Sequence, residues 1–161
     1  MATHRSLLAI ALSLACAAAL GQVSPNCQVR PKTLAAMRNC YRPLLVFSPT
    51  ASDPRLKRQA SILDTDADDM MDRFVLFTPI LPSAKGFAAP LDTPYVLLSQ
   101  QQMQSIRAQF HVTDESFIVL LLGEDGSEVL RSETPISSTR LNSLIDTMPS
   151  RKIEMQRPHA N

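Results

Sequence analysis

Three short apolar runs constrain the fold of this chain more than any other feature of its sequence. They occupy residues 44–47, 74–81 and 117–122. Each is long enough for a strand but shorter than a typical helix, and a continuous apolar run bounded by turn residues is typical of a strand buried on both faces. We therefore expect an open sheet with helices packed against both of its sides.

Helix-start patterns lie between these runs. Ser52-Asp53-Pro54 joins a capping residue to a proline at the first helical position, which opens a helix after the first run. Ser99 with Gln102 is a capping box that opens a second helix, over 99–110. Residues 81–98 contain three prolines and a glycine and predict a long loop, a length that is often functional in a compact domain.

The two ends of the domain complete the pattern. Residues 31–40 begin with a proline and predict a short helix before the first strand. Asp125-Gly126 predicts a hairpin turn into a strand over 128–131. Ser137 or Ser138 caps a last helix, which we expect to stop at Pro149. The fold class is therefore α/β: an N-terminal helix followed by βαβαββα, which is the thioredoxin-like order.

The first residues have the layout of a secretory signal peptide. A short positive start over 1–5 precedes a small and apolar run over 6–20, and Ala19 and Gly21 provide small residues for a cleavage site. The run is shorter than the about 20 residues of a membrane span, although an uncleaved anchor is the alternative. We predict a signal peptide over 1–21, an arm over 22–30, a thioredoxin-like domain over 31–155 and a disordered tail over 156–161. The mature chain, without a membrane span, would be periplasmic or secreted.

Two of the three cysteines, Cys27 and Cys40, follow the predicted cleavage site. In an oxidising compartment such a pair forms a disulfide by default, worth about 3 kcal/mol for a loop of this length. The helix predicted over 31–39 would push the two cysteines apart, so free or intermolecular thiols are the alternative. Their spacing is not that of a C-x-x-C redox pair.

The composition excludes several classes of function. The chain has four glycines, too few to form a phosphate-binding or dinucleotide-binding loop, so we expect no cofactor. Its 16 basic and 15 acidic residues give no electrostatic footprint for nucleic acid. The basic residues Arg151, Lys152 and Arg157 lack interleaved aromatic residues, and this indicates a solvated positive patch or a weak acidic partner, not nucleic acid. We expect a monomer.

The acidic run over 64–69 resembles the start of a calcium-binding EF-hand loop. Asp69 stands at the position of the required glycine, and Val75 at that of the bidentate glutamate. This favours a solvated acidic turn. Outside the predicted signal peptide the chain has two histidines, His111 and His159. Neither has other metal ligands at a suitable spacing around it, so the sequence predicts no metal site.

Three longer segments carry a family resemblance. They are RPLLVFSPTASDPRLKRQ (42–59), LLLGEDGSEVLRSETPIS (120–137) and LIDTMPSRKIEM (144–155). Together they resemble the secreted "domain of unknown function 4174" family, found in bacterial exported proteins and in vertebrate matrix proteins such as the sushi-repeat-containing and coiled-coil-domain-containing ones. The resemblance implies a thioredoxin-like fold related to peroxiredoxins and no established activity. The family's usual Gly-Lys-Asp-Gly has Glu124 in place of Lys here, and its usual Met-Pro-Met-Arg has Ser150 in place of the second Met; we expect both positions on the surface.

The junction of the first strand and the first helix is the candidate site. In thioredoxin-like enzymes the working cysteine lies there, and the helix N-terminus stabilises its thiolate. Residues 48–54 contain no cysteine, and no proline directly precedes Phe117, where thioredoxins carry a cis-proline. The usual thiol chemistry therefore lacks its nucleophile.

Asp53, Arg55 and Gln59 remain at this junction, in a D-x-R-x-x-x-Q pattern that the family resemblance picks out. Arg55 and Gln59 share one helical face and, with the helix N-terminus, would hold an anion or a carboxylate-bearing ligand. In the structural interpretation, Asp53 is the helix cap, Arg55 a surface charge and Gln59 a partner in a local hydrogen bond.

Two hypotheses for the function follow. The first is an exported thioredoxin-like domain without a catalytic thiol, which binds a protein partner or a small ligand. The second is an enzyme that works without a thiol, or a small-anion site, at the junction, with Asp53 and Arg55 as acid–base and electrostatic groups. A strongly perturbed Asp53 pKa in a concave site would favour the enzyme, and a capping Asp53 on a convex surface would favour the binding domain.

Overall fold

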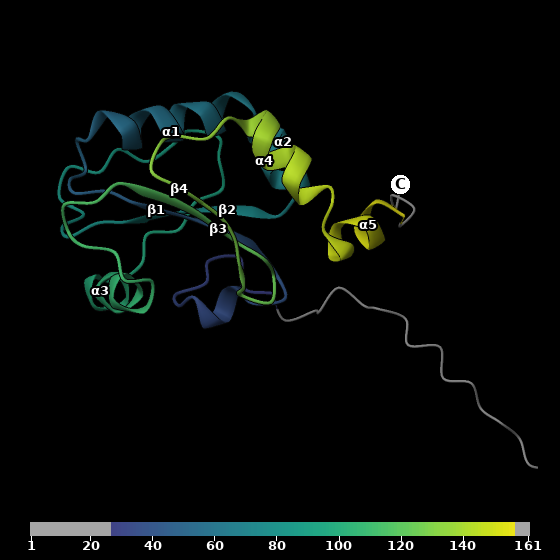
Figure 1. Cartoon of the computed structure of the whole chain (residues 1–161), viewed down its shortest axis with the longest axis horizontal. Coiled ribbons are helices and arrows are strands. Elements are labelled where there is room, and N and C mark those ends of the chain that lie inside the picture. Colours follow the sequence, from purple (N-terminus) through teal and green to yellow (C-terminus); the bar gives the residue numbers. More distant parts are fainter. Residues whose placement is uncertain (1–26, 157–161) are drawn as a thin grey trace, which may run out of the picture.

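A four-stranded sheet with the order β2-β1-β3-β4 lies at the centre of residues 27–156, the part of the chain that the computed structural model describes (Figure 1). The strands are β1 (Arg42–Phe47), β2 (Val75–Ile80), β3 (Ile118–Leu122) and β4 (Glu128–Ser132). The helices are the single 3-10 turn η1 (Ala35–Met37), α1 (Pro54–Thr65), α2 (Ala67–Asp72), α3 (Gln100–Gln109), α4 (Ser138–Ile145) and α5 (Pro149–Met155). The thioredoxin-like βαβαββα order predicted from the sequence is confirmed.

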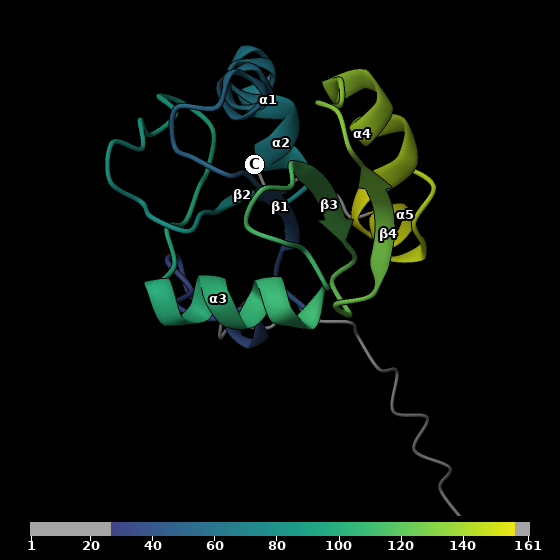
Figure 2. The ribbon, with the colours of Figure 1, turned by 60° about the vertical axis from the view of Figure 1, so that its left-hand side comes forward.

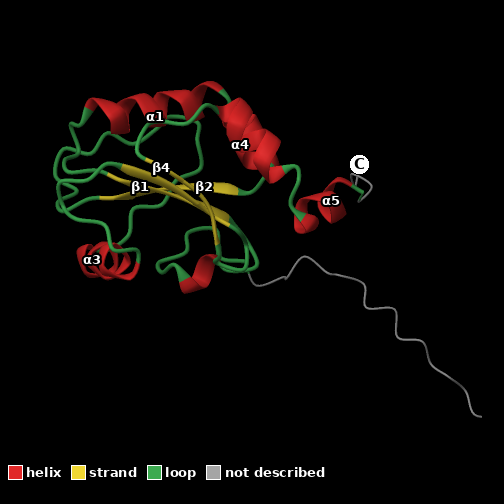
Figure 3. Ribbon diagram, viewed as in Figure 1, coloured by secondary structure: helices red, strands yellow, loops and turns green. Residues whose placement is uncertain are grey.

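The three apolar runs form the inner strands of the sheet and one of its edges. β1 is parallel to β2, with Leu44 beside Phe77, and antiparallel to β3, with Leu45 beside Leu120. Every residue of β1 and β2 is buried, as expected for strands covered on both faces. α1, α2 and α4 lie over one face, and α3 and η1 lie over the other (Figures 1 and 3). The view turned by 60° likewise places α3 across the sheet from α1 (Figure 2).

The prediction of a helix over 31–40 is wrong. Within this segment, Ala35–Met37 form a single 3-10 turn and the other residues are not helical. Asn39 has a φ of 59°, a left-handed backbone that no right-handed helix continues through. The chain instead folds back, so the Cα atoms of Cys27 and Cys40 lie 5.6 Å apart and their sulfurs are bonded. The predicted disulfide is confirmed, since the helix expected to oppose it does not form.

The C-terminal end also differs from the prediction. α4 ends at Ile145, and Pro149 begins α5 instead of stopping the preceding helix. A proline at the first helical position loses no hydrogen bond, because that N–H has no partner within a helix.

Asp68 and Asp69 of the acidic run are exposed to solvent, as predicted, but most of the run is helical and not a turn. Asp68 and Asp69 lie in the first turn of α2, where the positive end of the helix dipole stabilises their carboxylates. Asp66 precedes α2 and accepts a hydrogen bond from Ser138 at the start of α4. Through Asp66, the acidic run therefore connects α2 to α4, and both helices cover the same face of the sheet.

The loop predicted over 81–98 contains no helix and no regular strand. Asp64, at the end of α1, accepts hydrogen bonds from the N–H groups of Leu91 at 2.9 Å and Thr93 at 2.9 Å. Partial burial disfavours the charge of Asp64, but these donors outweigh it and lower the pKa of the carboxyl. One carboxylate thus fastens the middle of the loop to α1.

The predicted signal peptide over 1–21, residues 22–26 of the predicted arm and residues 157–161 of the predicted tail lie outside the described residues. Within residues 27–156, no helix has the length and apolar character to span a membrane.

Candidate functional site

Asp53 and Arg55 form a closed pair at the β1–α1 junction. Asp53 caps α1 by accepting a hydrogen bond from the Arg55 backbone N–H at 2.8 Å, and its other oxygen accepts one from the Arg55 guanidinium at 2.7 Å. That guanidinium also lies 4.8 Å from the ring centre of Phe117. The side-chain hydrogen bond from Arg55 lowers the pKa of Asp53, so the carboxyl is held ionised and already has its counter-charge.

Gln59 points away from this pair. Its side chain is fully buried, accepts a hydrogen bond from the Ile136 N–H at 2.7 Å and donates one to the Ile136 carbonyl at 3.1 Å. The structure therefore brings Asp53 and Arg55 together but turns the Gln59 amide toward the segment before α4. The sequence predicts a local hydrogen bond for Gln59. In the structure its partner, Ile136, lies 77 positions away in the sequence.

Arg107 is a buried group at the same end of the sheet that sequence reasoning missed. Its guanidinium donates to the carbonyls of Ser48 at 2.7 Å and Ile80 at 2.9 Å, just after β1 and at the end of β2. Burial lowers the pKa of this arginine, which nonetheless stays charged. Its position four residues after Met103, on the apolar side of α3, was the available signal that it turns inward.

The disulfide fastens residues 27–32, which we call the tethered segment, to the start of the domain. Besides the Cys27–Cys40 bond, the Tyr41 hydroxyl donates to the Gln28 carbonyl at 2.7 Å. Pro31 is buried, while Arg30 and Lys32 on either side of it are exposed. The segment therefore presents two cations from a fixed backbone.

An open groove of about 820 Å³ lies beside the tethered segment; we call it the edge groove. Residues 30–32 line one part of it, and residues 93–99 with Gln102 of α3 line the rest. Arg30 and Lys32 are its charged side chains, and no carboxylate occurs among the described residues that line it. The groove thus combines an apolar floor with positive charge.

Residues 93–98 run along the groove as an extended segment next to β2. The Phe77 N–H donates to the Pro94 carbonyl, and the Val96 N–H donates to the Phe77 carbonyl, both at 3.0 Å. Val96 and Leu98 are buried, whereas Tyr95 and Leu97 are 41% and 43% exposed. This alternation matches that of a strand, although Tyr95 alone forms a β-bridge, to Phe77 of β2.

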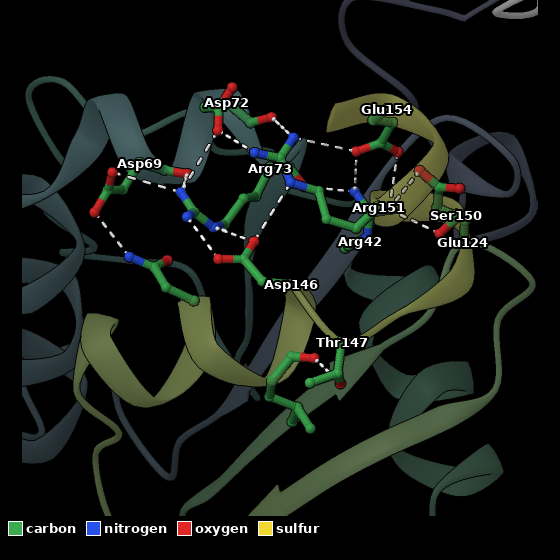
Figure 4. A network of polar contacts seen from close by, with 12 residues as sticks. Arg42, Asp69, Asp72, Arg73, Glu124, Asp146, Thr147, Ser150, Arg151 and Glu154 are labelled. Carbon is green, nitrogen blue, oxygen red and sulfur yellow. Dashed lines mark hydrogen bonds and ion pairs between the residues drawn. The ribbon is translucent and has the colours of Figure 1, made fainter. Parts of the chain in front are cut away.

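A second polar cluster, the arginine network, lies at the opposite end of β1 (Figure 4). Arg42 is fully buried there and donates to Glu154 at 2.8 Å, to Ser150 at 2.8 Å and to the Arg73 carbonyl at 2.8 Å. Glu124 of the β3–β4 turn lies 3.3 Å from the same guanidinium. Burial raises the pKa of Glu124; the charge of Arg42 opposes this and that of Glu154 adds to it.

Two more arginines extend the arginine network toward α2. Arg151 of α5 donates to Asp72, and lies 3.4 Å from Asp146. Arg73 binds Asp146 with two nitrogens, at 2.9 and 3.0 Å, and this pairing lowers the pKa of Asp146. Arg151 is only 6% exposed, so its predicted place in a solvated positive patch is wrong.

All three segments that carry the family resemblance meet in the arginine network. Arg42 comes from the first, Glu124 from the second and Ser150 from the third. The two positions at which this chain departs from the family's usual motifs, 124 and 150, therefore contact the same guanidinium. The prediction that both departures lie on the surface is wrong, because Glu124 is only 21% exposed and Ser150 binds a buried group.

No group of three or more potential metal ligands gathers anywhere in residues 27–156. The described carboxylates in the arginine network face arginines, and Asp64 faces backbone N–H groups.

Two solved structures are similar to this chain in their fold. Thioredoxin peroxidase I from Plasmodium yoelii is 15% identical, with a TM-score of 0.55, over 80% of this chain and 84% of that one. A reduced 2-Cys peroxiredoxin from Plasmodium vivax is 18% identical, also with a TM-score of 0.55, over 74% of this chain and 84% of that one. At such identities the likeness shows a thioredoxin-like fold and nothing about activity. No curated protein matches the sequence.

The family model of a domain of unknown function, DUF4174, matches residues 33–154. The match begins just after the tethered segment and ends at Glu154, so it includes the first two segments named above and all but the last residue of the third. The chain belongs to the DUF4174 family.

Proposed function

We propose that this chain is an exported, thioredoxin-like binding domain that works without a catalytic thiol and binds its partner in the edge groove. The observation that carries the proposal is the groove itself, about 820 Å³ in volume and lined by an exposed sheet edge and two cations. Clefts of this size with an apolar floor and a few placed polar groups are the usual form of a binding site.

The cysteine positions support a function without thiol chemistry. Cys27 and Cys40 are bonded to each other before β1, and residues 48–54, where the fold would place a nucleophile, contain none. The peroxidase activity in the names of the structural neighbours belongs to those proteins, and we do not extend it to this chain.

The alternative, an anion site or a thiol-independent enzyme at the β1–α1 junction, has weaker support. Asp53 has a lowered pKa and caps a helix, whereas a general acid working near neutral pH needs a raised one. Arg55 already pairs with Asp53, so its charge is partly neutralised and would hold an incoming anion less strongly.

Selection of peptides from a random display library, followed by amide NMR mapping with the enriched synthetic peptides, tests the proposal. We expect the peptides to shift amide signals of residues 30–32 and 93–102. Arg55→Ala should leave this binding unchanged. Shifts centred on residues 48–59, with binding abolished by Arg55→Ala, would instead establish the alternative site and overturn ours.

A further inference from the structure

We propose that the edge groove binds an extended acidic peptide, which adds as a strand beside residues 93–98 and pairs its carboxylates with Arg30 and Lys32. The inference rests on the proposed function and names the chemistry of the partner. Strand addition combines backbone hydrogen bonds with pockets for alternate side chains, and the groove offers both.

The backbone at this edge is oriented for pairing. Pro94 and Val96 use their carbonyl and N–H groups on Phe77 of β2, so the N–H and carbonyl of Tyr95 point away from the sheet. Neither the Tyr95 N–H nor the Leu97 N–H donates to any other group within residues 27–156. An unpaired edge of this kind is a template for another strand.

The length and the apolar surface fit a short peptide. At about 3.3 Å per residue, residues 93–98 pair with about five or six residues of an added strand. Tyr95 and Leu97 project from the edge with more than two fifths of their surface exposed. They would contact every second side chain of the added strand.

The charge of the groove selects the class of peptide. Arg30 and Lys32 flank the buried Pro31 and stand at the groove, while the described residues that line it provide no carboxylate to neutralise them. α3, whose first turn contains no acidic residue, also begins at the groove and adds a weak positive field. Each of these features favours an acidic ligand over a basic one.

The disulfide has a defined part in this site. The Cys27–Cys40 bond and the Tyr41–Gln28 hydrogen bond fix the tethered segment, so they hold both cations beside the edge. A ligand then binds without the entropy loss of ordering that segment.

Three matched hexapeptides test the inference by isothermal titration and amide NMR mapping on the purified protein. One alternates Glu with Val, one Gln with Val and one Lys with Val. Two surface ion pairs predict about 2- to 30-fold tighter binding of the Glu peptide than of the Gln peptide, and weakest binding of the Lys peptide. Added salt should remove most of the difference.

Two sets of variants separate charge from backbone pairing. Arg30→Gln/Lys32→Gln should bring the Glu peptide down to the affinity of the Gln peptide. The matched control Arg58→Gln/Arg140→Gln removes two exposed cations from α1 and α4 and should change nothing. Leu97→Pro removes one outward N–H and should weaken all three peptides more than Leu97→Ala does.

The outcomes distinguish this inference from the proposed function. If the Gln peptide binds in the groove as tightly as the Glu peptide, the acidic specificity is refuted while the binding function stands. If neither the hexapeptides nor any selected peptide maps to the groove, both fail. Concentration-dependent self-association that shifts the same amides would make the groove an interface between copies, and would also overturn the inference.

Discussion

Replacing Arg42 with methionine tests whether the arginine network holds the domain together. The guanidinium is fully buried and makes hydrogen bonds to Glu154, Ser150 and the Arg73 carbonyl. Without it, Glu124 loses its nearest cation, and Glu154 retains only Arg151, at 3.4 Å. Two partly buried carboxylates would then lie close together, and Arg151 would be the one cation left beside Glu154 within the described residues.

The size of the effect follows from the burial of the pair. Removing one partner of a buried ion pair costs about 3–5 kcal/mol, because the remaining charge stays desolvated. A domain of this size has about 5–15 kcal/mol of stability in total. Arg42→Met should therefore remove about a fifth or more of the free energy of unfolding at neutral pH.

Urea unfolding followed by far-ultraviolet circular dichroism measures this loss; the chain has no tryptophan to serve as a fluorescent probe. Arg58→Met on the exposed side of α1 is the control and should stay within about 0.5 kcal/mol of wild type. Arg42→Met/Glu154→Met should be less destabilised than the sum of the two single variants, because the double variant no longer leaves the Glu154 carboxylate buried without Arg42. A loss below about 1 kcal/mol for Arg42→Met, or strict additivity in the double variant, would refute the reasoning.

Three further predictions concern other parts of the chain. Gln59→Met leaves the buried N–H and carbonyl of Ile136 without their partner and should cost about 1–3 kcal/mol for each group, measured by thermal unfolding; an unchanged melting temperature contradicts it. Arg73 lowers the pKa of Asp146, so the stability that this carboxyl contributes is complete above its unfolded pKa of about 3.8 and disappears as the pH falls through its lower folded pKa. The stability difference between wild type and Asp146→Asn should accordingly vanish in acid, and a difference that persists there counts against the pairing. Export of the chain from a bacterial host should remove residues 1–21, which intact mass measures, and Gly21→Arg should block this cleavage; an exported wild-type protein of full-length mass would show that the leader is retained.

The strands were predictable because their signal is local. The runs at 44–47, 74–81 and 117–122 are largely apolar on both faces, and few structures other than strands covered on both sides bury both faces of so short a segment. The caps at Asp53, Ser99 and Ser137 all accept the hydrogen bonds expected of them.

The errors share one physical cause, which is that distant groups decide the outcome. The helix over 31–40 has a good local pattern, but a disulfide and a left-handed Asn39 replace it with one turn. Pro149 is compatible both with the end of one helix and with the start of the next, and only the packing of α5 against Arg42 decides between them. The local sequence around Arg151 predicts a surface cation. The folded chain brings Asp72 of α2 beside its guanidinium, and the pair is partly buried.

The candidate site was predictable only in part, for the same reason. Asp53 and Arg55 are two residues apart, so their pairing is a local event. The edge groove combines residues 30–32 with 93–102, and no periodicity within either segment reports that they meet. The disulfide joins the tethered segment to Cys40 before β1, and nothing local in the sequence shows that this places residues 30–32 beside residues 93–99.

The arginine network also bears on the order in which the chain folds. Arg42 and Glu154 are 112 positions apart, so their contact closes one of the longest loops in the domain, and such contacts form late because loop closure must be offset first. A growing or translocating chain that lacks α5 already contains every strand of the sheet, yet it would bury Arg42 with Glu124 as its nearest carboxylate. We therefore expect the packing of α5 against Arg42 to be one of the last steps in the folding of the domain.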